Sequence, residues 1–189
     1  MNGRARPGRA TGGLALRSFS TLRSPCLNLL GITRRSAPVH ILLPPAPWGH
    51  RSLFQTDRMA SCFLDTMFHY RREGKFLLHE FVVMPSHFHL ILTPLDIALE
   101  RAVQFIKGGF PHRVKKELGL NCEIWERGYV DHRVRDANDY ARHVVYIREN
   151  PVEAQIASRA EEYLDSSGHG GFDLDPCPQG LKPEALRTA

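Results

Sequence analysis

Two short apolar runs, separated by Pro85 and Ser86, constrain the fold of this chain more than any other feature. The runs "KFLLHEFVVMP" and "HFHLILTP" have the length of β-strands and include Phe, Val and Ile, which favour pleated, half-buried surfaces. Proline and serine favour a turn between such runs. The sequence therefore predicts a β-hairpin within a sheet.

The second run of this hairpin carries two histidines, His87 and His89, on either side of Phe88. Side chains alternate between the two faces of a strand, so both imidazoles should point to one face and Phe88 to the other. Two imidazoles on one face supply half of a metal site. Taken alone, they fit an ordinary polar strand face equally well, so the metal hypothesis needs a third ligand.

Two amphipathic helices are expected around the hairpin. The first should begin at Thr56 or Asp57, both good helix caps, and end at Gly74. The second should begin at Asp96, with residues 108–111 (Gly-Gly-Phe-Pro) loosening its middle.

A third helix, "ANDYARHVVYIREN", should begin at Asp136, and Pro151 should prevent it from continuing unbroken. The run "CEIWERGYVDHRV" before it adds one or two short strands. Helices that return between strand pairs indicate an α+β fold with a mostly antiparallel sheet.

The third helix offers the missing ligand. Tyr146 and Asn150 are four residues apart and therefore lie one turn apart on the same face. If this helix crosses the strand of His87 and His89, the Asn150 amide oxygen becomes a third metal ligand and the Tyr146 hydroxyl points at the same ion. A phenol is a weak nucleophile at neutral pH, but a divalent metal that polarises a phosphate can compensate. The expected chemistry is transesterification of a phosphodiester.

The positive charge of the chain is concentrated at its start. The net charge is +5, whereas residues 1–58 alone hold nine Arg and one acid. Residues 1–47 are predicted to be a basic, disordered extension, 48–157 the catalytic domain and 158–189 an irregular, loosely packed tail. The extension also imitates a mitochondrial transit peptide. The four cysteines are scattered and no apolar stretch could span a membrane, so a soluble, cytoplasmic protein is expected.

Three segments, "EFVVMPSHFHLILTP", "IWERGYVDHRVRDANDYARHVVYIRENPVEA" and "FDLDPCPQGLKP", resemble the REP-associated tyrosine transposases. These bacterial mobile-element enzymes are a branch of the HUH single-tyrosine transposases. The resemblance implies a ferredoxin-like domain with helices on one face of its sheet. It also implies Mg²⁺ or Mn²⁺, and no small-molecule cofactor, in a tyrosine attack on single-stranded or hairpin DNA that leaves a 5′-phosphotyrosine link.

Carried over by position, the resemblance makes His87 and His89 the metal-binding pair, Asn150 the third ligand and Tyr146 the nucleophile. One stretch departs from the family pattern: "VHILLPPAP" has three prolines where a first strand is expected, so that strand is predicted to be degraded. Candidate phosphate contacts are the basic residues Lys107, Arg133, Arg135, Arg142 and Arg148.

Three functions remain open from the sequence. The first is a metal-dependent DNA strand-transfer enzyme, acting alone or as a homodimer. The second is an inactive DNA-binding relic with a damaged first strand, and the third is a metal hydrolase unrelated to nucleic acid. His132, His143 and Glu126 either support the site or belong to a solvated surface, and the basic residues fit a plain charged surface as well.

Overall fold

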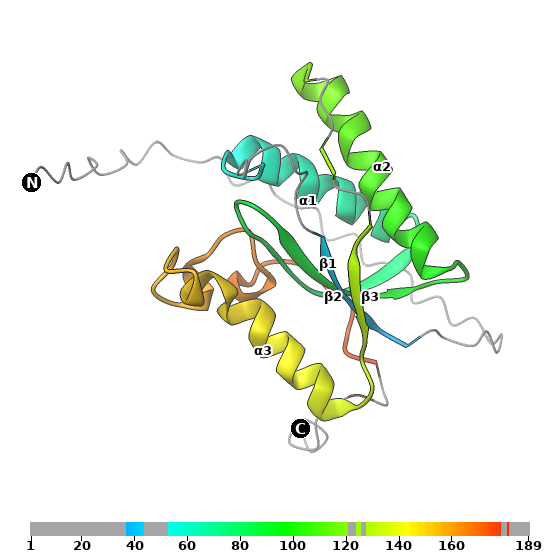
Figure 1. Ribbon diagram of the computed structural model, residues 1–189, viewed down its shortest axis with the longest axis vertical. Coiled ribbons are helices and arrows are strands. Elements are labelled where there is room, and N and C mark those ends of the chain that lie inside the picture. Colours follow the sequence, from blue (N-terminus) through cyan, green and yellow to red (C-terminus); the bar gives the residue numbers. More distant parts are fainter. Residues whose placement is uncertain (1–36, 44–52, 121–123, 126–127, 179–180, 182–189) are drawn as a thin grey trace, which may run out of the picture. The chain divides into compact units, whose positions relative to one another are not determined.

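The predicted hairpin forms one side of a four-stranded antiparallel sheet (Figure 1). The computed structural model describes residues 37–43, 53–120, 124–125, 128–178 and 181. Strands β2 (Phe76–Val83) and β3 (Phe88–Pro94) make the hairpin. Strand β1 (Val39–Leu43) pairs with β3, and β4 (Val130–Arg133) pairs with β1, which gives the order β2-β3-β1-β4.

Three helices complete the fold: α1 (Asp57–Arg72), α2 (Leu99–Leu118) and α3 (Ala137–Glu153). Two short 3₁₀ helices, η1 (Ala160–Glu162) and η2 (Ser167–His169), follow. The order β1-α1-β2-β3-α2-β4 with this strand arrangement is the ferredoxin-like topology. The predicted α+β, ferredoxin-like class is confirmed.

The helices divide between the two faces of the sheet (Figure 1). Helices α1 and α2 pack on the face formed by Phe81, Phe88 and Leu90. Helix α3 packs on the opposite face, against Val82 and Ile91. The expectation that all helices lie on one face is therefore wrong for α3, because β2 and β3 present apolar side chains on both faces. A sheet apolar on both faces needs two covering layers.

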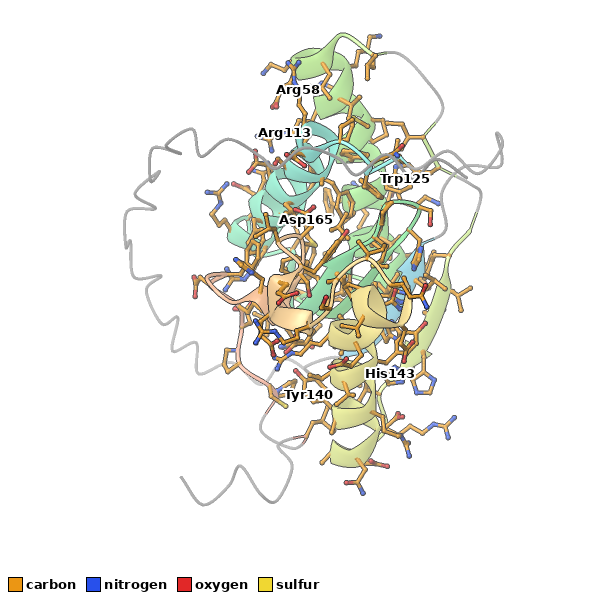
Figure 2. All side chains as sticks on the ribbon, turned by 90° about the vertical axis from the view of Figure 1, so that its left-hand side faces the viewer. Arg58, Arg113, Trp125, Tyr140, His143 and Asp165 are labelled. Atoms are coloured by element: carbon orange, nitrogen blue, oxygen red, sulfur yellow. The ribbon has the colours of Figure 1, made fainter. Side chains whose placement is uncertain are left out.

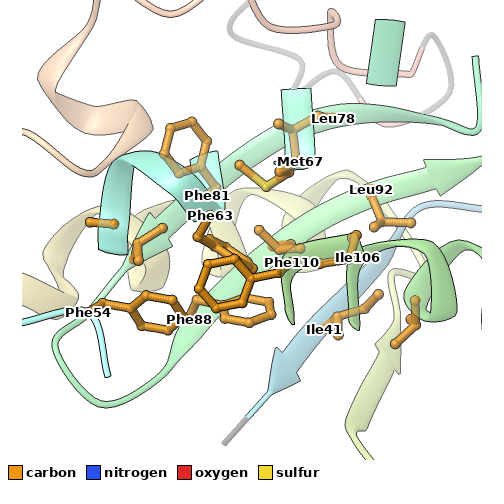
Figure 3. Packing of buried hydrophobic residues seen from close by; sticks show 14 of the residues in the cluster. Ile41, Phe54, Phe63, Met67, Leu78, Phe81, Phe88, Leu92, Ile106 and Phe110 are labelled. Atoms are coloured by element: carbon orange, nitrogen blue, oxygen red, sulfur yellow. The ribbon is translucent and has the colours of Figure 1, made fainter. Parts of the chain in front are cut away.

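The main core lies between the sheet and the pair α1 and α2. Figure 3 shows aromatic rings from both helices and the sheet meeting there, with Phe63 at the centre. The ring centroid of Phe63 lies 4.4 Å from that of Phe88 and 5.3 Å from that of Phe110. Such tilted and edge-to-face contacts add to the free energy gained from removing apolar area from water.

The N-terminal caps of two of the three helices are those predicted from the sequence. Thr56 Oγ1 accepts the Met59 N–H at the start of α1, and the Asp136 carboxylate accepts two N–H groups at the start of α3, as predicted. Asp96 does not cap α2, which begins three residues later with no side-chain cap. Asp96 instead has φ of 50°, a turn conformation that Asp tolerates better than most residues.

Neither proline interrupts its helix. Pro111 lies inside α2, and Pro151 lies in the last turn of α3, which runs on to Glu153. A proline removes one backbone hydrogen bond, and here packing outweighs that loss: Phe110 and Asn150, the residues just before the two prolines, are both buried. The interruption predicted at Pro151 is therefore wrong.

Strand β1 also corrects the sequence prediction. The first strand is present and central, since it pairs on both sides. Pro44, Pro45 and Pro47 all come after its last residue, so they remove no N–H from its ladders.

The chain divides into two units, 1–32 and 33–189, and every described residue belongs to the second. The predicted disorder of residues 1–36 and 44–47 lies outside the described residues.

The C-terminal segment packs along the free edge of β2. The Val83 N–H donates to the Asp165 carbonyl at 2.9 Å, and the Phe81 N–H donates to Ser167 Oγ at 3.1 Å. The Tyr163 hydroxyl donates to the Val83 carbonyl at 2.8 Å. The described part of the segment is irregular apart from η1 and η2. These hydrogen bonds show that its expected loose packing is wrong. An unpaired edge strand invites aggregation, and this segment covers it.

Asp175 joins this segment to α1 and β2. Its carboxylate accepts two hydrogen bonds from the Arg71 guanidinium, the shorter at 2.6 Å, and one from the Leu78 N–H at 2.8 Å. The Asp175 N–H in turn donates to the Leu78 carbonyl at 2.9 Å. Nearby, Phe172 stacks on Phe68 with ring centroids 5.8 Å apart. One carboxylate therefore satisfies a mostly buried guanidinium and an edge N–H together.

We expect Asp175→Ala to lower the free energy of unfolding by about 2–4 kcal/mol, because it removes the carboxylate that accepts hydrogen bonds from the Arg71 guanidinium and the Leu78 N–H. Urea denaturation measures this. Asp173→Ala is the matched control: that carboxylate is 87% exposed and 3.6 Å from Arg71, so its loss should cost less than about 0.5 kcal/mol. Equal effects of the two substitutions would contradict the role given to Asp175.

Candidate metal and nucleophile site

The two predicted ligands, His87 and His89, lie where the hairpin meets α3. Strand β3 turns Phe88 into the main core and His89 to the α3 face, where it is 2% exposed. His87 precedes the strand by one residue, in the turn where the Met84 N–H donates to the His87 carbonyl at 2.8 Å. The two ring centroids are 5.1 Å apart. The alternation predicted from the sequence therefore brings both imidazoles together.

Helix α3 delivers Tyr146 and Asn150 to these imidazoles. Its apolar residues Tyr140 and Ile147 are buried against the sheet, which fixes the rotation of the helix. Tyr146 lies edge-on to His89, with ring centroids 5.2 Å apart, and remains 43% exposed. Asn150 is buried, and its side chain hydrogen bonds the His87 imidazole. All four predicted site residues are thus neighbours within one chain.

The site contains one histidine that the sequence reasoning missed. His40 lies on β1, and its Nε2 is 3.0 Å from His89 Nδ1. Its ring also faces His143 on α3, at 4.6 Å between centroids. His40 was overlooked because it falls in the stretch expected to be a degraded strand. The signal was available: His40 belongs to "VHILL", an apolar run of strand length that ends just before Pro44.

Burial keeps the imidazoles of the site neutral. Burial, together with the smaller effect of neighbouring histidines, lowers the pKa of His89 to about 3 and that of His40 to about 4. The pKa of His87 is also lowered by burial, against a smaller opposing effect of the Asn150 hydrogen bond. A neutral imidazole is the form that binds metals, so these rings need no proton removed near neutral pH.

These donors fit a divalent cation. Two neutral imidazoles and one amide oxygen converge, and the Nδ1 atoms of the two imidazoles are already engaged. Ser86 Oγ lies 3.0 Å from His87 Nδ1, and His40 occupies His89 Nδ1. Ligating histidines commonly hold such a partner on the second ring nitrogen, which fixes the ring orientation.

A second group of residues that could hold a metal ion lies beside His40. His132 on β4, with Asp139 and His143 on α3, places one ligand atom each within 4.8 Å of the others. Figure 2 shows His143 and Tyr140 on α3, at the end of the view opposite Arg58 and Arg113 on the α1 and α2 side. Glu126, the third residue suggested to support the site, lies outside the described residues.

The basic residues suggested as DNA contacts are not gathered in one patch. Arg135 and Arg142 are exposed near the start of α3, whereas Arg133, which pairs with Val39, points to the other face of the sheet. Lys107 lies on α2 and donates to the Gly128 carbonyl. Arg148 forms a two-point ion pair with the buried Glu80 carboxylate, at 2.6 and 3.2 Å. Arg148 thus has a structural partner, and DNA contacts by all five stay predictions.

Among the described residues, no helix is long and apolar enough to cross a membrane.

Two curated proteins are similar to this chain in sequence. A REP-associated tyrosine transposase of Escherichia coli K12 is 31% identical over 101 residues, which are 52% of this chain and 58% of that protein. A Haemophilus influenzae protein, provisionally given the same name, is 28% identical over 108 residues, or 51% of this chain and 61% of its own length. The chain thus spans about three fifths of these relatives. No family model matches it.

A solved structure shares the fold. It is a REP-associated tyrosine transposase bound to a REP hairpin, with a TM-score of 0.59 and 22% identity, and the match covers 80% of this chain and 91% of that one. The chain is therefore similar in sequence to REP-associated tyrosine transposases and shares the fold of one of them.

Proposed function

We propose that this protein cleaves and rejoins single-stranded or hairpin DNA, with Tyr146 as the nucleophile and a divalent cation, Mg²⁺ or Mn²⁺, held by His87, His89 and Asn150. The observation that carries this proposal is the contact between Tyr146 and His89, at 5.2 Å between ring centroids. It brings a phenol from α3 to paired imidazoles from β3. The hairpin DNA bound by the related solved structure supports the choice of substrate.

The chemistry is an exchange of phosphate esters. The Tyr146 oxygen attacks the phosphorus, the bond from phosphorus to the 3′ oxygen breaks, and that oxygen leaves as a 3′-hydroxyl after gaining a proton. The tyrosine loses its proton and holds the 5′-phosphate. A bound cation would polarise the phosphate and neutralise its developing charge. The reverse attack by a 3′-hydroxyl rejoins the strand without an external energy source.

The residues of this chain position the reactants. Tyr146 is partly exposed, so a DNA strand can reach it, while His89, His40 and Asn150 are buried behind it. His40 holds the His89 ring through Nδ1, which leaves Nε2 for the cation. Because all these side chains come from one chain, the proposed site needs no residue from a second copy, although a homodimer is still compatible with it.

The structure gives less support to the other two hypotheses, the inactive relic and the metal hydrolase, and each can be tested. The relic hypothesis rested on a lost first strand, whereas β1 is present and carries His40. The hydrolase hypothesis needs no nucleic acid and does not account for a tyrosine beside the imidazoles. DNA binding without a covalent product would support a relic, and no DNA retention at low salt would support a hydrolase.

We expect Tyr146→Phe to abolish the covalent adduct between the protein and a labelled hairpin oligonucleotide, because the attacking oxygen is removed. Denaturing gel electrophoresis after incubation with Mn²⁺ or Mg²⁺ measures the adduct. Tyr129→Phe serves as the control, since Tyr129 packs at the edge of the main core. An adduct of normal yield in Tyr146→Phe would exclude this residue as the nucleophile.

We expect His87→Ala to abolish metal-dependent cleavage but to retain most DNA binding, because the imidazole is proposed to hold the cation and not the DNA. Cleavage and gel-shift assays on the same preparation separate the two effects. His112→Ala, an exposed histidine on α2, is the matched control and should behave as wild type. Parallel loss of cleavage and binding would mean that His87 is a structural residue.

We expect His40→Phe to weaken the binding of Mn²⁺ about 10- to 100-fold, because His89 loses the partner that orients its ring. Isothermal titration calorimetry gives the affinity. Higher Mn²⁺ should restore much of the cleavage, which a merely misfolded variant would not show. Unchanged Mn²⁺ affinity would refute the positioning role of His40.

A further inference from the structure

The group His132, Asp139 and His143 has the geometry of a metal site of its own. His132 Nε2 lies 2.9 Å from Asp139 Oδ2, and His143 Nε2 lies 3.7 Å from Asp139 Oδ1. Nitrogen and oxygen ligands at about 2.0–2.2 Å from a tetrahedral ion are separated by about 3.3–3.6 Å. The two contacts involve different oxygens of Asp139, and one ligand atom from each of the three residues lies within 4.8 Å of the other two. Side-chain rotation would bring these atoms to the separation that an ion requires.

Helix α3 and strand β4 bring these three side chains close together. Asp139 and His143 are one turn apart on α3, and His132 comes from β4, where it pairs with His40. The Asp139 carboxylate is buried, and the His132 hydrogen bond, followed by the Arg135 N–H, holds its pKa well below the usual range. Burial lowers the pKa of His143. The group thus offers one carboxylate and an imidazole that burial keeps neutral.

We propose that His132, Asp139 and His143 bind a second divalent metal ion, of the first-row transition type represented by Zn²⁺, separate from the His87, His89 and Asn150 site. Two imidazoles and one carboxylate are a common set of three protein ligands, with a fourth position left for water.

A simple hydrogen-bond network is the competing explanation. It accounts for the contact between His132 and Asp139, but not for His143, whose Nε2 faces the same carboxylate from 3.7 Å, beyond hydrogen-bond distance. The Arg142 guanidinium lies 3.1 Å from Asp139 Oδ1 and would compete with a cation there. Its side chain is 74% exposed, so it can move into solvent at little cost.

The proposed ion would fasten the start of α3 to the sheet edge. Strand β4 is four residues long and lies at the edge of the sheet, where it pairs with β1 in the described part of the chain. Its residue His132 is hydrogen bonded to Asp139 on α3. Tyr146 follows His143 by one turn, so the fastening would fix the helix that carries the proposed nucleophile. The proposal itself depends only on the geometry of the three ligands and stands without the DNA chemistry.

The test removes the ligands His87 and His89 of the first site and measures how much zinc the protein still binds. In the full chain carrying His87→Ala and His89→Ala, dialysed against Zn²⁺ and analysed by elemental mass spectrometry, we expect about one Zn²⁺ per chain. Zinc should also raise the melting temperature of this variant. No bound zinc in the folded double variant would overturn the proposal.

Adding His143→Ala in the same background should reduce zinc affinity at least about 10-fold and remove the zinc-dependent rise in melting temperature. This substitution removes one partly exposed ring, so the fold should persist, which circular dichroism checks. The matched control is His112→Ala in the same background, which should keep the zinc. Unchanged zinc affinity in the His143→Ala variant would show that the ion binds elsewhere and would refute the site.

Discussion

The burial of histidines between the sheet and α3 is the constraint on which the rest of this structure depends. Strand β3 sends Phe88 and Leu90 into one layer and His89 and Ile91 into the other, so both faces must be covered. A buried imidazole without partners would cost about 1–3 kcal/mol. His40 supplies the partner for His89. The central position of β1 is therefore required by the polar chemistry of the sheet as well as by its backbone ladder.

Polar groups are also paired at the other side of the sheet, along strand β2. Strand β2 is an edge strand of eight residues, and its outer N–H and C=O groups would be open to water or to another chain. The segment 163–175 satisfies several of them, and Asp175 adds a bridge to α1. Glu80, on the α3 face of β2, is neutralised by Arg148 and also accepts from Ser167. The C-terminal segment thus stabilises the strand that supports the histidine hairpin.

The sequence predicted correctly the features that depend on the periodicity of strands and helices. Alternation in β3 placed His87 and His89 on one face, and the four-residue spacing in α3 placed Tyr146 and Asn150 on one side. It failed where tertiary contacts outweigh local preference. Pro151 continues a helix that packing holds, and the glycine- and proline-rich tail is held by long-range bonds, such as that of Asp175 with Arg71, 104 residues apart. His40 was missed because nearby prolines were read as part of its strand.

Helix α3 explains why the two proposed metal sites can share one small face. Residues 139, 143, 146 and 150 follow one another at intervals of three or four, so they form a single stripe along the helix. The first two meet His132 on β4, and the last two meet His89 on β3 and His87 in the turn before it. His40 on β1, the strand between β4 and β3, contacts both groups. Any rotation of α3 would therefore disturb both groups together, which links the position of the tyrosine to the whole row of histidines.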